Sequence, residues 1–260
     1  MNTVMYPCSC CGSRTLGAPP PGSYLICPVC FWEDLPQDQF WPVPYCRALR
    51  QAQRTFQTIG ACDRHYIHDV RPAETHEQPP TGWRTIDDMS ERLNLEIREA
   101  FAEVTRGAGV TLHEADVLDL YGSNEERLAA RQLDTDRHWY EVPDDLIARK
   151  SSALSFLDAA GFRYYLPAYL SWTLRNYDSS DSNSIHSLLF DLALRPWQED
   201  RTHHESTARA RFGLLTTIQS QVVCRALRFL VAYCYPCVDT KLAQTALDQY
   251  WGDFCPAPAT

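Results

Sequence analysis

The N-terminal part of the chain contains the segments YPCSCCG at residues 6–12 and ICPVC at residues 26–30. They place two Cys-x2-Cys pairs, Cys8/Cys11 and Cys27/Cys30, fifteen residues apart. This spacing is typical of a four-thiolate zinc site, because each pair sits on a tight turn that directs two sulfur atoms at one point. The sequence therefore predicts one structural Zn²⁺ ion bound by Cys8, Cys11, Cys27 and Cys30, with no coordination position left for water.

The residues around these pairs are those of a zinc ribbon followed by a helix. Gly12 supplies a permissive backbone for the first turn, and residues 24–26 are a candidate strand leading into the second pair. Residues 45–59 carry apolar side chains at helical spacing, and Gly60 follows as a stop signal. We expect a small zinc-ribbon-like module with one helix over residues 1–71.

The motif resembles the bacterial cysteine-rich CPCC family, which has proline where this chain has Ser9. The segments GSYLICPVCFWED at residues 22–34 and HDVRP at residues 68–72 share the likeness, which covers about residues 5–75. The resemblance implies a metal site without a defined activity. It also implies a bacterial setting, in which such domains recur beside toxin and immunity genes.

A change in composition near residue 84 suggests a domain boundary. The segment RPAETHEQPPTG at residues 71–82 is rich in proline and polar side chains, as interdomain linkers are. The predicted organisation is a cysteine-rich module at 1–71, a linker at 72–84 and an acidic all-α domain at 85–255.

The second part is expected to be a helical bundle, so the chain as a whole is predicted to be mainly α. Residues 86–104 form one amphipathic helix, and capping boxes at Thr111–Glu114 and Ser123–Glu126 open two more. A short helix at 152–160 is predicted to end at Gly161, and another to begin at Pro167. Three further helices are expected at residues 184–194, 214–234 and 239–251.

A second resemblance supports this boundary. Three segments are similar to an uncharacterised bacterial helical domain of unknown function: residues 134–146 (DTDRHWYEVPDDL), 152–158 (SALSFLD) and 161–170 (GFRYYLPAYL). The likeness covers about residues 90–235. It implies a separate helical domain and carries no activity with it.

The formal net charge is −9, from 33 acidic and 24 basic residues. Residues 1–84 hold seven of each, whereas residues 111–148 hold ten acidic and three basic residues, a net charge of −7. A chain with more acidic than basic residues does not neutralise phosphate groups over its whole surface, which argues against direct nucleic-acid binding. Any such contact would rest on a few arginines, such as Arg47, Arg50 and Arg54.

The sequence carries no recognisable catalytic motif, so we expect a protein that is not an enzyme. It has no secretory signal and no apolar stretch suited to a membrane, which predicts a soluble, cytoplasmic protein. Its eleven cysteines are then expected to stay reduced. Cys234 and Cys237 have redox spacing, but a buried or incidental pair is the simpler interpretation.

The leading hypothesis is an immunity protein that neutralises a cognate bacterial toxin by covering a basic active-site cleft. An acidic segment suits such a cleft, because complementary charge speeds association. The predicted contacts are acids around two aromatic anchors: Asp134, Asp136, Trp139, Tyr140, Asp144 and Asp145. The alternative that these acids only cap helices and keep the protein soluble is left open. The alternative function is a zinc-ribbon regulatory or accessory subunit that contacts nucleic acid or a larger complex.

Overall fold

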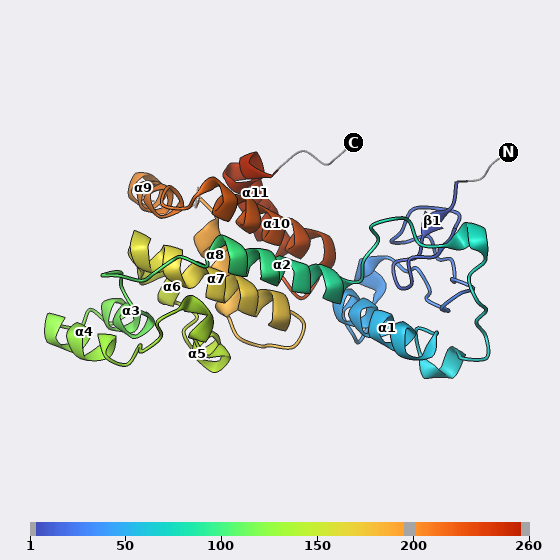
Figure 1. Cartoon of the computed structure of the whole chain (residues 1–260), viewed down its shortest axis with the longest axis horizontal. Helices are drawn as coiled ribbons and strands as arrows, with labels where there is room; N and C mark the ends of the chain where they lie inside the picture. Colours follow the sequence, from blue (N-terminus) through green and yellow to red (C-terminus); the bar gives the residue numbers. More distant parts are fainter. Residues whose placement is uncertain (1–3, 195–200, 256–260) are drawn as a thin grey trace. The chain divides into compact units, whose positions relative to one another are not determined.

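The computed structural model describes residues 4–194 and 201–255 and is mainly α-helical, as the sequence predicts. The chain forms two compact units: unit 1 comprises the residues up to Glu91 and the return segment Tyr233–Cys237, and unit 2 comprises Arg92–Ala232 and the residues from Val238 onward. Figure 1 shows their elements along the chain. The division falls at residues 91 and 92, and the segment 72–84, predicted as a linker, belongs to unit 1.

Unit 1 is built on a small ribbon. Strand β1 (Tyr6–Pro7) pairs antiparallel with β2 (Arg14–Leu16), and an isolated bridge joins Ile26 to Glu33. The helical elements are α1 (Tyr45–Ile59) and the 3-10 turns η1 (Gln37–Gln39), η2 (Arg64–Tyr66) and η3 (Thr75–Glu77). The ribbon and its helix are present, while the candidate strand at 24–26 is reduced to the single bridge.

Helix α1 buries one side within unit 1. Tyr45 and Leu49 are buried on that side, together with the polar side chain of Gln53. The Gln53 amide donates to the Ser9 carbonyl and accepts from the Ile86 N–H, each at 2.8 Å. Because both of its polar groups are paired, Gln53 fixes α1 against the ribbon and against the first residue of the next helix.

Two contacts hold the segment 72–84 in unit 1. The Arg71 guanidinium makes two hydrogen bonds of 2.6 Å to the buried Glu77 carboxylate and lowers the pKa of that carboxyl to about 2. The Trp83 ring covers Gly12 so closely that a Cβ atom there would lie 2.5 Å from it. The segment is therefore packed structure, because glycine in the first cysteine turn leaves room for the indole.

Unit 2 is all-α in the residues that the structure describes. Helix α2 (Ile86–Ala100) contributes residues 92–100 to it. The remaining elements are α3 (Leu112–Asp119), α4 (Asn124–Arg131), η4 (Trp139–Glu141), α5 (Asp144–Arg149), α6 (Ala153–Phe156), α7 (Ala159–Asn176), α8 (Ser184–Leu192), α9 (Arg201–Phe212), α10 (Thr217–Tyr233), α11 (Thr240–Gln249) and η5 (Trp251–Phe254). No helix in the described ranges combines the length and the apolar character needed to cross a bilayer.

Helix α7 forms the core of unit 2 and runs through two residues predicted as helix boundaries. The Asp158 carboxylate accepts from the Gly161 N–H at 2.8 Å, so the helix begins at Ala159 instead of ending at Gly161. Glycine is needed at 161 because the Val110 carbonyl oxygen lies 2.4 Å from the position of a Cβ atom. Pro167 lies inside the helix, where burial on nearly every side compensates for the lost hydrogen bond.

Two disulfides join cysteines that were expected to stay reduced. Cys46 of α1 is bonded to Cys237 in unit 1, and Cys224 of α10 is bonded to Cys255 in unit 2. Cys234 is buried and has no disulfide, so Cys234 and Cys237 do not form a redox pair with each other. The sequence does not reveal the partners, because they meet only through packing.

Helix α3 ends in a left-handed turn that is occupied by a tyrosine. The Tyr121 N–H donates to the Leu118 carbonyl at 3.2 Å and the Gly122 N–H donates to the Val117 carbonyl at 2.8 Å, the Schellman pattern of helix C-termini. The residue after the C-cap Leu120 then has a positive φ and is usually glycine. Here it is Tyr121, at φ 55°. A side chain in this conformation costs about 1–2 kcal/mol.

We expect Tyr121→Gly to raise the free energy of unfolding by about 0.5–1 kcal/mol, because the steric cost removed exceeds the added freedom of the unfolded chain. Urea denaturation measures the change. Tyr121→Ala is the matched control, since it removes the ring but keeps the Cβ atom that causes the strain. Equal stability of the glycine and alanine variants would contradict the assignment of strain.

Candidate functional site

The two Cys-x2-Cys turns have the same backbone geometry. The Cys8 carbonyl accepts from the Gly12 N–H at 2.8 Å, and the Cys27 carbonyl accepts from the Phe31 N–H at the same distance. Gly12 and Phe31 occupy corresponding places and both have positive φ, 77° and 66°. Each turn therefore presents its two cysteines in the same way, and β1 and the Ile26–Glu33 bridge lead the chain into the turns.

The four thiols gather at one buried point. Their sulfur atoms all lie within 4.8 Å of one another, with 3.7 Å between Cys8 and Cys30 and 3.7 Å between Cys11 and Cys27. A tetrahedral ion with metal–sulfur bonds of about 2.3 Å needs sulfur atoms about 3.8 Å apart. The cluster thus fits a structural metal, whose four protein ligands would leave no open position.

Hydrogen bonds among the thiols set their protonation. The pKa of Cys27 is lowered because the Cys11, Cys30 and Cys8 thiols donate to its sulfur. The Thr15 hydroxyl donates a further bond, at 3.1 Å. The pKa of Cys8 is raised by its hydrogen bonds to Cys11 and Cys27 and by burial. Four thiolates cannot coexist in this space without a cation, so full ionisation of the cluster would require a bound metal, with which its geometry is compatible.

Cys10 and Cys62 of unit 1 lie outside this group of four. Cys10 is fully buried, and the Cys62 N–H donates to the Cys30 carbonyl at 2.6 Å. Burial raises the pKa of Cys62 to about 12, which keeps it a neutral thiol. The grouping therefore leaves Cys10 out of the set of four.

Asp136, a predicted contact residue, lies in the interior of unit 2. Its carboxylate pairs with the Arg106 guanidinium at 3.1 Å and accepts from the Tyr164 hydroxyl at 2.8 Å. Arg106 also donates to the Tyr165 hydroxyl at 2.9 Å. Burial raises the pKa of Tyr164, so its hydroxyl remains a donor. Asp136 therefore serves an internal polar network and cannot contact a partner.

Asp134 and Trp139 are also internal. The Asp134 carboxylate accepts from the backbone N–H and the ring of His113, at 2.9 and 2.8 Å, and its side chain is 0% exposed. The Trp139 indole donates to the Phe101 carbonyl at 3.0 Å. The prediction that Asp134, Asp136 and Trp139 form a surface is wrong, because residues distant in sequence bring them inside.

The other three predicted contact residues are exposed. Tyr140 is 42% exposed. Asp144 pairs with Arg175 at 2.6 Å, and Asp145 pairs with Arg149 at 2.9 Å. Their role in binding a partner stays a prediction, and the two ion pairs already match their negative charge.

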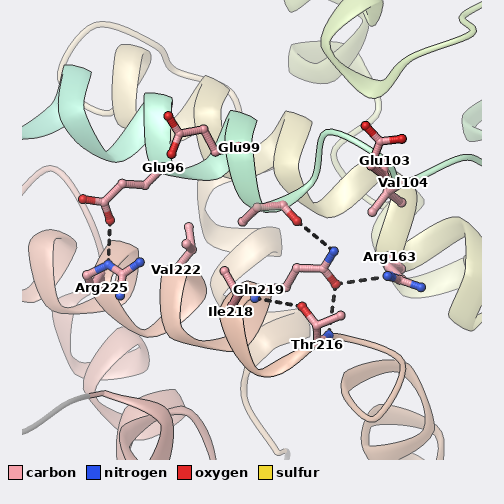
Figure 2. Close-up of a pocket in the computed structure, with 11 residues that line it drawn as sticks. Glu96, Glu99, Glu103, Val104, Arg163, Thr216, Ile218, Gln219, Val222 and Arg225 are labelled. Atoms are coloured by element: carbon pink, nitrogen blue, oxygen red, sulfur yellow. Dashed lines mark hydrogen bonds and ion pairs between the residues drawn. The ribbon is translucent and has the colours of Figure 1, made fainter.

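A pocket of about 510 Å³ lies in unit 2 between α2, α7 and α10 (Figure 2). The buried Gln219 forms part of its wall: its amide donates to the Ala100 carbonyl at 3.0 Å and accepts from Arg163 at 3.2 Å and from the Thr216 N–H at 3.1 Å. Because these bonds use both ends of the amide, Gln219 joins the three helices to one another.

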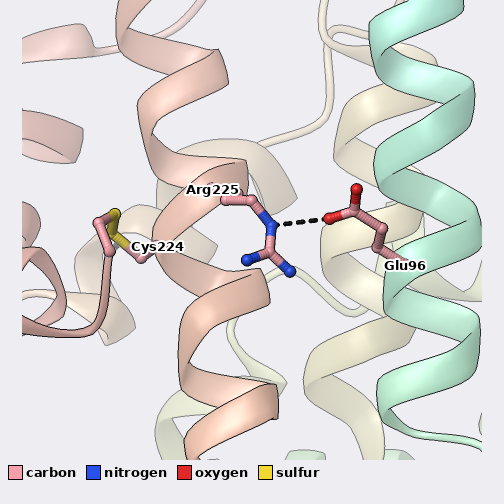
Figure 3. The surroundings of a disulfide bond; sticks show 4 residues. Glu96, Cys224 and Arg225 are labelled. Carbon is pink, nitrogen blue, oxygen red and sulfur yellow. Dashed lines mark hydrogen bonds and ion pairs between the residues drawn. A yellow bond between two sulfur atoms is a disulfide. The ribbon is translucent and has the colours of Figure 1, made fainter. Parts of the chain in front are cut away.

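One end of this pocket is closed by an ion pair. Arg225 of α10 contacts Glu96 of α2 at 2.7 Å, beside the disulfide of Cys224 (Figure 3). Glu99 of α2 and Glu103, which follows that helix, also line the pocket. The lining thus combines apolar side chains with charged side chains of both signs.

The geometry defines a cysteine-rich module whose four clustered thiols are compatible with a structural metal, followed by a helical domain. The comparisons with known families agree with this organisation. The chain belongs to the family of unknown function DUF6714, which matches residues 89–254. Residues 6–77 match the cysteine-rich CPCC family. No curated protein and no solved structure matches the chain. Both resemblances noted in the sequence are therefore confirmed.

We expect the double variant Cys27→Ser/Cys30→Ser to lose its bound metal and to unfold unit 1, because metal binding supplies much of the folding free energy of so small a module. Metal content by mass spectrometry and protection of unit 1 amides from hydrogen exchange are the measurements. Cys62→Ser is the matched control and should keep the metal. Full metal content in the double variant would contradict the ligand assignment.

We expect Thr15→Val to weaken metal binding by about 10–100-fold, since a hydrogen bond to a ligating sulfur orients it and stabilises its thiolate. Competition with a chromophoric chelator measures the affinity. Thr15→Ser keeps the hydroxyl and should bind as the parent does. If the valine variant matches the parent, the bond to Cys27 has no role in holding the ion.

Proposed function

We propose that this chain is an immunity protein: a binding protein, not an enzyme, that neutralises a cognate bacterial toxin by covering its basic active-site cleft. The supporting observation is the location of negative charge in the segment 111–148 that no cation among the described residues matches. The resemblance of unit 1 to domains found beside toxin genes supplies the biological setting.

Most acids of this segment have internal partners. Beyond Asp134, Asp136, Asp144 and Asp145, described above, the Glu114 carboxylate pairs with Arg131 at 2.6 Å and Asp116 pairs with Lys150. Glu141 accepts from the backbone N–H groups of Arg137 and His138. These carboxylates stabilise unit 2 and leave little charge for a partner.

Four acids of the same segment have no ion pair among the described residues: Glu141, which accepts the two backbone hydrogen bonds just described, and, on the α3–α4 hairpin, Asp119, Glu125 and Glu126. Asp119 is the last residue of α3, and Glu125 and Glu126 lie in the first turn of α4. Glu126 caps its own helix through Ser123, whereas the Glu125 side chain is exposed. The α3–α4 hairpin therefore presents unmatched negative charge, which complements a basic cleft.

We propose that the metal of the four-cysteine cluster is Zn²⁺ and that its role is structural. Four buried sulfur ligands in a tetrahedron suit zinc, and unit 1 has only five residues in paired strands to hold its ribbon. In this proposal the ion fixes unit 1, and unit 2 contacts the toxin.

We expect the charge-reversal variant Asp119→Lys/Glu125→Lys to protect cells less well against the toxin encoded beside this gene. Loss of steering should slow association by about tenfold or more at low salt and flatten its salt dependence. Co-expression survival and stopped-flow kinetics are the measurements. Asp181→Lys/Asp253→Lys is the matched control, because it reverses two exposed acids that lie outside the segment 111–148. Full protection by the double variant Asp119→Lys/Glu125→Lys would show that the toxin contact lies outside this hairpin.

A further inference from the structure

The tip of the α3–α4 hairpin exposes large apolar side chains. Tyr121 is 96% exposed, Leu120 is 80% exposed and Leu128 is 64% exposed. Leu120 and Tyr121 lie in the connection between the helices, and Leu128 lies on α4, one turn after Glu125. We call Leu120, Tyr121 and Leu128 the hairpin tip. Side chains of this size contribute nothing to the core of unit 2 at these exposures.

The hairpin tip also carries strain that the fold does not need. Tyr121 occupies the left-handed position of a Schellman turn, where glycine would satisfy the same two hydrogen bonds without the clash of a Cβ atom. The Tyr121 ring makes no hydrogen bond or ring contact within the part of the chain that the structure describes. The turn therefore presents an exposed tyrosine at a cost to stability, and no hydrogen bond or ring contact among the described residues offsets that cost.

The surroundings of the hairpin tip select its partner by charge. Asp119 precedes Leu120, and Glu125 shares an exposed face of α4 with Leu128, three residues later. Apolar anchors bordered by unmatched carboxylates fit a socket ringed by lysine or arginine side chains. A second copy of this chain would bring like charges together, which disfavours self-association through this surface.

We infer that Leu120, Tyr121 and Leu128 are the anchor of a protein–protein interface whose partner is a basic protein with an apolar socket. The identification of that partner as a toxin rests on the proposed function, whereas the surface itself rests on exposure, strain and charge. Tyr121 is the central anchor, because a tyrosine buries a large area at little cost in side-chain entropy.

The test places the photoreactive residue p-benzoylphenylalanine at position 128 of the full chain, in the cells that naturally produce it. The same residue at position 218 is the matched control, since Ile218 is 63% exposed against 64% for Leu128 and lies on α10. We expect irradiation to give an adduct with one basic protein from position 128 and none from position 218. Glu125→Lys in the same chain should reduce the yield.

Tyr121→Gly provides a second measurement that loss of folding cannot mimic. This variant is expected to be at least as stable as the parent and yet to lower the adduct yield by about tenfold or more, while Tyr121→Phe keeps the yield. An equal yield from position 218, an adduct with a second copy of the chain, no adduct, or an unchanged yield in Tyr121→Gly would overturn the inference. A basic adduct that is not a toxin would sustain the interface and refute only the immunity function.

Discussion

The mutual proximity of four buried sulfur atoms constrains unit 1 more than any other contact. Within 4.8 Å of one another, these groups can share one cation, and such sharing requires that both cysteine turns keep one geometry. The left-handed residues Gly12 and Phe31 follow from that requirement, as does the short ribbon. The contact of Trp83 with Gly12 then ties the segment 72–84 to the first turn. Order in unit 1 therefore spreads outward from the cluster.

Unit 2 depends on a different principle, the pairing of buried charge. Arg106, Asp136 and the two adjacent tyrosines form a network whose members all have partners, which is the condition under which burial of charge is tolerated. The acids of the segment 111–148 thus divide into two groups. Most stabilise the helices that surround α7, and a few at the α3–α4 hairpin remain without a matching cation.

Local patterns predicted local structure well. Cysteine spacing identified the four grouped thiols, capping boxes marked the starts of α3 and α4, and periodicity located most helices. The patterns failed where distant residues decide the outcome. The sequence indicated surface charge at Asp134 and Asp136, because their partners His113 and Arg106 approach them only in the folded structure. The sequence predicted a helix end at Gly161, because the close contact of this residue with Val110 leaves no signal in the sequence.

The bond between Cys46 and Cys237 has a topological consequence. Its partners are 191 residues apart, so it closes a covalent ring that contains the division at residues 91 and 92 and nearly all of unit 2. A single backbone cut anywhere within the ring leaves one covalently connected molecule. A protease can therefore cut the chain between the two units, and the two fragments stay covalently linked until the disulfide is reduced.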